Sequence, residues 1–186
     1  MKKTKGVISI LNLIKEVSTQ TYEYGCIMLY FGEFKELLEI HNFIKKSDIY
    51  TEEEDKSFGL EDEPHCTLLY GLHEEVSVSE IKEVVKDFKF EECILSELSL
   101  FENEKYDVLK FDVIGDNLHE CNKALKNLPY TTDFPNYKPH LTVGYLKKGK
   151  GKSYLEKLRK KYRDISLSPK NIVYSTPNDG KFNISM

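Results

Sequence analysis

The 186-residue sequence contains no tryptophan and no excess of positive charge. Its 27 lysine and arginine residues are outnumbered by 31 aspartate and glutamate residues, which gives a formal net charge of −4 at pH 7. Proteins that hold long nucleic acid by neutralising phosphates usually carry a basic excess, so the composition argues against a long nucleic-acid partner. A small phosphorylated ligand is compatible with this charge.

Cysteine is scarce and long hydrophobic runs are missing. The four cysteines contain no C-x-x-C pair, which predicts buried free thiols and argues against a zinc site. No apolar run is long enough to span a membrane, and the run at 7–14 is interrupted by polar residues and lacks a signal-peptidase site. We therefore expect an N-terminal amphipathic helix within residues 1–21 of a cytoplasmic protein, with no membrane partner and no obligate protein partner.

One seven-residue motif occurs twice. The sequence Pro64-His65-Cys66-Thr67-Leu68-Leu69-Tyr70 is followed 75 positions later by Pro139-His140-Leu141-Thr142-Val143-Gly144-Tyr145. A shuffled chain of this composition would hold about 0.008 copies of Pro-His-x-Thr, so two copies do not arise by chance. Each copy predicts a strand, in which alternation places the histidine and threonine on one face and Tyr70 or Tyr145 on the opposite face, in the core.

Two imidazoles and two hydroxyls that face one cleft suit chemistry at a phosphodiester. A neutral histidine can take a proton from an attacking hydroxyl while a protonated histidine gives one to the leaving oxygen. The hydroxyls of Thr67 and Thr142 can donate to the non-bridging phosphate oxygens. This scheme uses neither a metal nor a cofactor, so we expect neither, and because the two motifs are nearly identical either His65 or His140 can be the base.

The remaining pattern predicts an α+β fold. After the leading helix, the order strand, helix, motif strand, helix, strand occurs twice, which predicts two pseudo-symmetric βαβαβ-like halves with antiparallel sheets around a central cleft. We expect one domain over 1–186, with a first lobe at 22–101, a second lobe at 106–176 and a tail at 177–186. Helix starts are predicted at Ser77, Asp116 and Ser153, and a final strand at 165–175.

The acidic segment 47–63 is the longest predicted loop, and it leads directly into the first motif. It is either a solvated connector or a flap over the cleft, because long loops beside sites often serve as lids. His41 falls on the apolar stripe of the preceding helix, which favours a structural role for that imidazole.

Paired His-x-Thr motifs in two similar halves of a small chain resemble the 2H phosphoesterase superfamily. That family includes RNA-ligase-like 2′,3′-cyclic phosphodiesterases, enzymes that act on 2′-5′ linkages, and phage phosphodiesterases that destroy the cyclic nucleotide signals of CBASS immunity. The resemblance covers about residues 22–176. It implies the bilobal 2H fold and a hydrolase acting on phosphodiester bonds, with His65 and His140 catalytic and Thr67 and Thr142 binding phosphate.

The substrate implied by this resemblance is a cyclic di- or oligonucleotide. The acidic segment before His65 is unlike the basic clefts of many RNA-processing members, and the compact acidic chain looks more like the phage anti-CBASS type. We therefore expect viral counter-defence in the host cytoplasm, with a cyclic nucleotide or short oligonucleotide as partner. The alternatives are a 2′,3′-cyclic or 2′-5′ RNA phosphodiesterase, and a sponge that binds cyclic nucleotides without cleaving them.

Other ligand-binding candidates come from residue type and position. Exposed aromatic rings can stack on nucleobases and lysines can contact phosphate, although core packing and ordinary surface lysine are the alternatives. The stacking candidates are Tyr22, Tyr24, Tyr137 and Tyr174, together with Phe182. The lysine candidates are Lys138, Lys147, Lys148 and Lys181.

Overall fold

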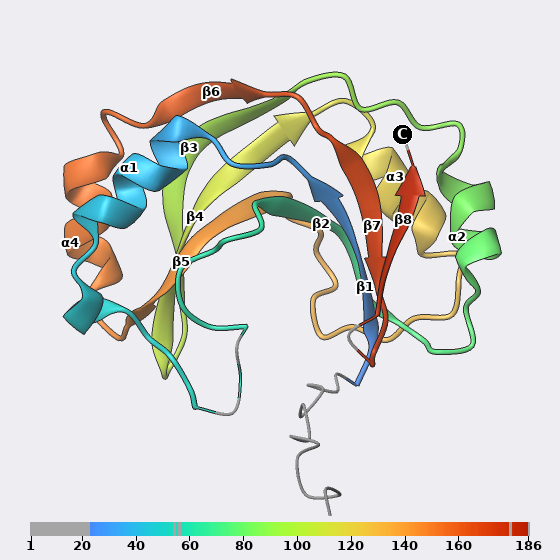
Figure 1. Ribbon diagram of the computed structural model, residues 1–186, viewed down its shortest axis with the longest axis horizontal. Helices are drawn as coiled ribbons and strands as arrows, with labels where there is room; N and C mark the ends of the chain where they lie inside the picture. The colour runs from blue at the N-terminus through green and yellow to red at the C-terminus, as the bar shows by residue number, and fades with distance from the viewer. Residues whose placement is uncertain (1–22, 54, 56, 179, 186) are drawn as a thin grey trace, which may run out of the picture.

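The two motif strands lie side by side at the centre of one antiparallel sheet (Figure 1). The computed structural model describes residues 23–53, 55, 57–178 and 180–185, and its eight-stranded sheet has the order β6-β3-β4-β5-β2-β1-β7-β8. The motif strands are β2 (His65–Leu72) and β5 (His140–Lys147). The others are β1 (Gly25–Tyr30), β3 (Cys93–Glu102), β4 (Tyr106–Gly115), β6 (Arg163–Leu167), β7 (Asn171–Ser175) and β8 (Lys181–Ser185). The predicted α+β class is confirmed.

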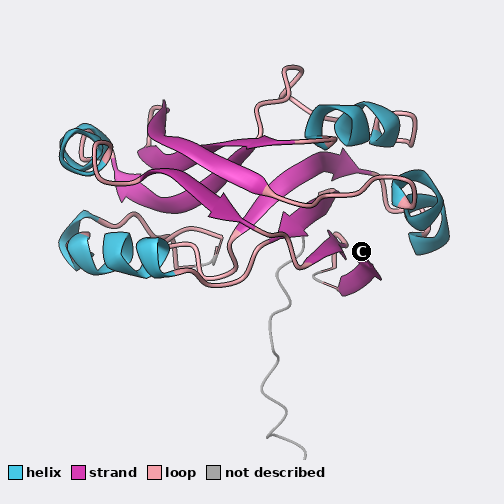
Figure 2. Cartoon of the chain, turned by 90° about the horizontal axis from the view of Figure 1, so that it is seen from above, coloured by secondary structure: helices cyan, strands magenta, loops and turns pink. Residues whose placement is uncertain are grey.

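A pair of helices flanks each end of the sheet (Figures 1 and 2). Helices α1 (Lys35–Phe43) and α4 (Gly151–Leu158) pack beside β3, β4 and β5. Helices α2 (Val78–Val85) and α3 (Leu118–Leu125) pack beside β2 and β8. Each helix buries one apolar face in the core, and a short 3-10 helix, η2 (Lys46–Asp48), follows α1.

The two halves of the sheet do not follow the predicted lobe boundaries. Strand β3, which the sequence placed in the lobe 22–101, lies between β4 and β6, and β7, placed in the lobe 106–176, lies between β1 and β8. The expected strand 165–175 is two strands, β6 and β7, on opposite halves of the sheet. Within the expected tail 177–186, β8 pairs with β7 and so extends the sheet.

Helix starts follow the sequence where the cap is local. Ser77 and Glu80 form the predicted capping box of α2, an arrangement worth about 1 kcal/mol. Helix α4 begins at Gly151, before the predicted cap Ser153, because the Gly151 N–H donates at 2.9 Å to the buried carboxylate of Asp107 on β4. At α4 a carboxylate distant in the sequence thus replaces the predicted local cap. Helix α3 also departs from the prediction, because its N-cap is Asn117 instead of Asp116.

The four cysteines are free, as predicted, and three of them are buried. Burial raises the pKa of the Cys66 thiol to about 12, so this group stays protonated and unreactive near neutral pH. Within the described ranges, no helix is long and apolar enough to cross a membrane. The predicted N-terminal helix lies outside the described residues.

Strands β2 and β5 share a single backbone residue pair, and beyond it each strand forms hydrogen bonds with a loop. The loop that leads into β2 pairs with β5, where the Glu61 N–H donates to the Val143 carbonyl at 3.1 Å. The loop that leads into β5 pairs with β2, where the Thr131 N–H donates to the Gly71 carbonyl at 2.8 Å. Each loop therefore satisfies the strand of the opposite motif, which holds the two halves in register.

Gly71 is the tightest point of this arrangement and allows a stability prediction. Its φ is +101°, and an added Cβ would lie 1.8 Å from the Thr131 carbonyl oxygen. Gly149 also has a positive φ, +80°, but has nothing within 4 Å of an added Cβ. Gly149→Ala should therefore cost only backbone strain, about 1–2 kcal/mol of unfolding free energy, whereas Gly71→Ala should cost about 3 kcal/mol or more. Urea unfolding of both variants tests this, and equal losses would show that the loop yields at Thr131.

Candidate active site

One backbone pair brings the four motif side chains together. Strands β2 and β5 are joined by Cys66 opposite Leu141, both fully buried. Because the strands are antiparallel, His65 lies across from Thr142 and Thr67 lies across from His140. Side chains next to a core-facing pair point to the other face, so both histidines and both threonines share the face opposite the core.

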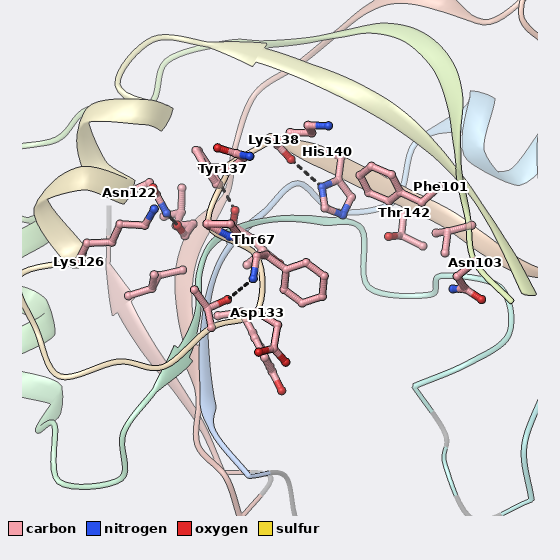
Figure 3. A pocket seen from close by; sticks show the side chains of 18 of the residues that line it. Thr67, Phe101, Asn103, Asn122, Lys126, Asp133, Tyr137, Lys138, His140 and Thr142 are labelled. Carbon is pink, nitrogen blue, oxygen red and sulfur yellow. Dashed lines mark hydrogen bonds between the residues drawn. The ribbon is translucent and has the colours of Figure 1, made fainter. Parts of the chain in front are cut away.

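A cavity of about 620 Å³ opens on this face, within the range of small-ligand sites (Figure 3). Thr67, His140 and Thr142 line it, and Figure 3 shows these three side chains around the same space. His65 lies on β2 beside the cavity, with its ring stacked on Tyr30 at 5.6 Å between centroids.

The two histidines are held in the same way. The His65 Nδ1 lies 2.8 Å from the Glu63 carbonyl oxygen, and the His140 Nδ1 lies 2.8 Å from the Lys138 carbonyl oxygen. A carbonyl oxygen only accepts, so each Nδ1 carries the hydrogen and each Nε2 is left to exchange a proton. Each motif thus fixes its imidazole through the backbone two residues before it.

The surroundings of the two histidines differ in charge. The Glu61 carboxylate lies 3.7 Å from the His65 Nδ1, and burial raises the pKa of Glu61. Phe101 packs edge-on against His140 at 5.0 Å. Burial lowers the pKa of His140, and the nearby Lys110 ammonium lowers it further. Glu61, Phe101 and Lys110 were not identified from the sequence.

A β-bulge in each motif strand corrects the prediction for the motif tyrosines. Opposite β1, Thr67 pairs with Met28 and Leu69 with Ile27, which leaves Leu68 as an extra residue. Opposite β4, Val143 is extra in the same way. An extra residue reverses the alternation that follows it. Tyr70 and Tyr145, predicted to lie in the core, therefore line the cavity, and Tyr70 is 40% exposed.

The carbonyl of each extra residue is bound by a helix. Asn122 of α3 is buried and its Nδ2 donates to the Leu68 carbonyl at 2.6 Å. His41 of α1 donates from Nε2 to the Val143 carbonyl at 2.9 Å. Burial lowers the pKa of His41, and its hydrogen bond gives it the structural role predicted from the sequence.

Only some of the stacking and lysine candidates lie at the cavity. Tyr137 and Lys138 line the cavity, and the Tyr137 hydroxyl donates to the Thr67 carbonyl at 3.0 Å. Tyr174 is buried in the core, where it stacks on Phe182, and Tyr24 stacks on His73, away from the cavity lining. Tyr22 lies outside the described residues. Of the lysines, Lys148 pairs with Asp107 and Lys181 pairs with Glu63, and Lys147 is exposed at the end of β5.

The acidic loop 47–63 is anchored along β5. The Tyr50 N–H donates to the Tyr145 carbonyl at 2.9 Å, and the Tyr145 N–H donates to the Gly59 carbonyl at 2.7 Å. The rings of Tyr50 and Phe58 also pack against Tyr106 of β4. These contacts fix the described part of the loop along β5 and against β4, which disfavours the flap interpretation.

The loop at 131–138 forms one wall of the cavity. Asp133 and Phe134 line the cavity there, and the Phe134 side chain is 70% exposed. Asn122 and Lys126 extend the lining to α3 (Figure 3). The site thus combines exposed aromatic rings with side chains of both charges. No group of three or more histidine, cysteine or acidic side chains that could hold a metal ion is found among the described residues.

Comparison with solved structures shows the fold. The chain is similar to Usb1 from Kluyveromyces marxianus, with a TM-score of 0.57 and 8% sequence identity over 89% of this chain and 99% of that one. The structure of the same Usb1 with uridine monophosphate gives a TM-score of 0.57 and 11% identity, covering 88% and 98% of the two chains. No curated protein sequence matches significantly.

Comparison with protein families gives the assignment. The model of the family described as anti-CBASS protein Acb1 matches residues 51–173. The match includes both motifs, the bulged part of each motif strand and the loop at 131–138, and it covers more than half of the chain. The chain therefore belongs to the anti-CBASS protein Acb1 family.

Proposed function

We propose that this protein is a phosphodiesterase that cleaves cyclic di- or oligonucleotide second messengers and thereby counters CBASS immunity. The observation that carries the proposal is the matched pair of histidines, each with Nδ1 bonded to a carbonyl and Nε2 free, flanking two threonine hydroxyls. Membership of the anti-CBASS family supports this function. The structure of the fold neighbour with uridine monophosphate supports a nucleotide ligand.

The reaction proceeds through the 2′-hydroxyl next to a 3′-5′ linkage. One neutral histidine takes the proton of this hydroxyl, whose oxygen attacks the phosphorus atom, and the other histidine, protonated, gives its proton to the departing 5′-oxygen. The ring opens with a 2′,3′-cyclic phosphate at one end and a 5′-hydroxyl at the other. Water then opens the cyclic phosphate with the two histidines in exchanged roles, so that both return to their starting states.

Thr67 and Thr142 stabilise the charge that builds on the phosphate. They lie on either side of the Cys66–Leu141 pair, each across from a histidine, so a phosphate above this pair is within reach of both hydroxyls. Donors fixed in advance are most effective where charge develops in the transition state.

Nucleobases bind to the exposed rings around the phosphate. Tyr70 and Phe134 line the cavity, and 40% and 70% of their surfaces are exposed. Exposed apolar rings are costly without a ligand, and a nucleobase stacked on them would cover them. Lys126 and Lys138 offer positive charge and Asp133 offers an acceptor for base N–H groups. This mixed lining suits a compact ligand with bases and few phosphates better than a long polyanion.

Incubation with a substrate panel tests the proposal. The panel contains 3′,3′-cyclic GMP-AMP, cyclic triadenylate, 2′-5′ oligoadenylate and RNA ending in a 2′,3′-cyclic phosphate, with products resolved by chromatography. We expect the cyclic di- or trinucleotide to be linearised faster than the RNA end is opened. Because both proton transfers are assigned to imidazoles, the rate should persist in EDTA.

The His140→Ala protein, purified in parallel, is the control for contaminating nucleases. Cleavage of the RNA end alone would replace the proposal with an RNA-processing function. Binding of a cyclic nucleotide without cleavage would identify a sponge, and activity that requires a divalent ion would contradict the two-histidine mechanism.

A further inference from the structure

A buried lysine lies next to the second motif. Lys110 of β4 is 3% exposed, and lysine is almost never buried unless it is paired. Its Nζ donates to the Ser99 hydroxyl at 2.7 Å and also to the Asp112 carboxylate. The Asp112 side chain is 43% exposed, so the lysine is the deeply placed member of this pair. Its ammonium is therefore a fixed positive charge inside the fold.

Strand register and the Phe101 ring place this charge near His140. In the β4–β5 pairing, Lys110 lies opposite Thr142 and Asp112 lies opposite His140, so all four side chains share the cavity face. The Lys110 Nζ lies 4.2 Å from the centre of the Phe101 ring, and the same ring packs edge-on against His140 at 5.0 Å. Phe101 thus contacts both the cation and the imidazole, and its apolar ring offers neither of them a polar group that would weaken their repulsion.

Among the residues that the structure describes, no lysine or arginine of β1 lies opposite the first motif. The β1 residues opposite His65 and Thr67 are Tyr30 and Met28, and the charged group nearest His65 is the Glu61 carboxylate, 3.7 Å from Nδ1. A protonated His65 therefore gains an ion pair, whereas a protonated His140 meets a buried ammonium. The two motifs are alike in backbone geometry and opposite in their electrostatic surroundings.

We propose that Lys110 is a positioning residue that keeps His140 neutral in the free enzyme, so that His140 takes the proton of the attacking hydroxyl and His65 gives the proton to the leaving oxygen. This inference rests on the proposed function and goes beyond it, because it assigns the two roles that the motifs leave equivalent. The roles exchange in the second step, when water opens the cyclic phosphate.

Several charged groups face His140 and determine in which direction its pKa should change when one of them is removed. Lys110 and Asp112 come from β4 and His65 from β2, while Asp133, Lys126 and Lys138 line the same cavity together with the phenols of Tyr70, Tyr106, Tyr137 and Tyr145. The pKa of His140 is lowered first by burial; the Lys138 carbonyl opposes this, Lys110 and His65 add to it, and Asp112 opposes it. Removing the cation should therefore raise the His140 pKa, and removing the carboxylate should lower it.

NMR titration of His140 in the ligand-free protein tests the inference, with His140→Ala used to assign its resonance. Lys110→Met removes the charge and keeps the length of the side chain, and we expect the His140 pKa to rise by about one unit. Lys110→Arg keeps the charge and should leave the value close to that of the wild type. Asp112→Asn should shift it in the opposite direction, downward.

Lys82→Met on the exposed face of α2 is the matched control, because it removes the same charge from a helix that packs against β8, at the edge of the sheet, and should leave the His140 pKa unchanged. An unchanged His140 pKa in folded Lys110→Met, or a shift in the same direction in Lys110→Met and Asp112→Asn, would overturn the inference. If Lys110→Met does not fold, the downward shift in Asp112→Asn decides. The titration needs no substrate, so failure of the wild-type protein to cleave any nucleotide is a separate result that concerns the proposed function alone.

Discussion

Alanine in place of His65 or His140 is expected to lower the turnover of a cyclic dinucleotide by roughly 10²–10⁴-fold or more. Each imidazole is held at Nδ1 by a backbone carbonyl, which leaves Nε2 for the proton transfer, and alanine removes this group. The measurement is kcat by chromatography under saturating substrate. Binding of the uncleaved cyclic nucleotide should persist in both variants, because the stacking rings and the threonines remain.

The matched control is His73→Ala. His73 lies just after β2 and bonds to Thr131 and Glu75, and it does not line the cavity. Its loss should change turnover only a few-fold, well below the effect of either motif histidine. A His140→Ala protein with wild-type turnover would show that the second motif is structural.

The pH dependence of kcat/KM tests the role of His140 as the base. A base must be neutral, and the pKa of His140 is lowered by burial. The rate should therefore rise with pH through a value below the ordinary histidine pKa of about 6.5 and reach its plateau earlier than an exposed histidine would allow. Replacing His140 should abolish this limb while leaving the fold intact.

The sequence predicts the centre of this fold because the motifs are local and repeated. The alternation around His65 and His140 and the proline before each require only short-range geometry, and the capping box at Ser77 likewise involves neighbours in the chain. By contrast, the start of α4 depends on Asp107, a residue 44 positions before Gly151 on β4, the strand that pairs with β5. Features fixed by tertiary contact are not visible in a local pattern.

The motif tyrosines show the same limit within a single strand. Alternation alone places Tyr70 and Tyr145 in the core, but the bulges at Leu68 and Val143 turn both rings to the cavity. These bulges are stabilised by Asn122 and His41, which come from helices far away in the sequence. The two consecutive apolar residues after each threonine, Leu68-Leu69 and Val143-Gly144, are a local signal of the bulge, because both residues of each pair are buried where alternation would expose one.

Lys110 illustrates a functional residue that sequence reasoning misses for a different reason. Between Leu109 and Phe111 it reads as the solvent-facing position of an alternating strand. The structure buries it because β4 lies between β3 and β5, where Lys110 packs against Ser99 and Phe101 of β3. A polar residue in a strand that has neighbours on both sides is therefore a candidate for the functional site, but the sequence does not show which strands are its neighbours.

Removal of a motif hydroxyl is expected to have the second-largest effect. Thr67→Val and Thr142→Val keep the shape of the side chain and exchange the hydroxyl for a methyl group, and each should lower kcat by roughly 10²–10³-fold, as the loss of one oxyanion donor does. The Thr67 hydroxyl lies 3.9 Å from the Cys26 Sγ, a weak contact whose loss in the valine variant should cost little stability. Thr67→Ser and Thr142→Ser retain the donor and should lose far less activity.

The division of this loss between kcat and KM distinguishes catalysis from simple binding. If the hydroxyls act on charge that develops at the phosphate during the reaction, kcat and kcat/KM fall together and KM changes little. If they only hold the ground-state phosphate, KM rises while kcat is kept. Because Thr67 lies across from His140 and Thr142 across from His65, a phosphate between the histidines contacts both hydroxyls, so either valine variant should give the first pattern. A rise in KM alone in both variants would place the reacting phosphate away from the Cys66–Leu141 pair and would remove the threonines from the mechanism.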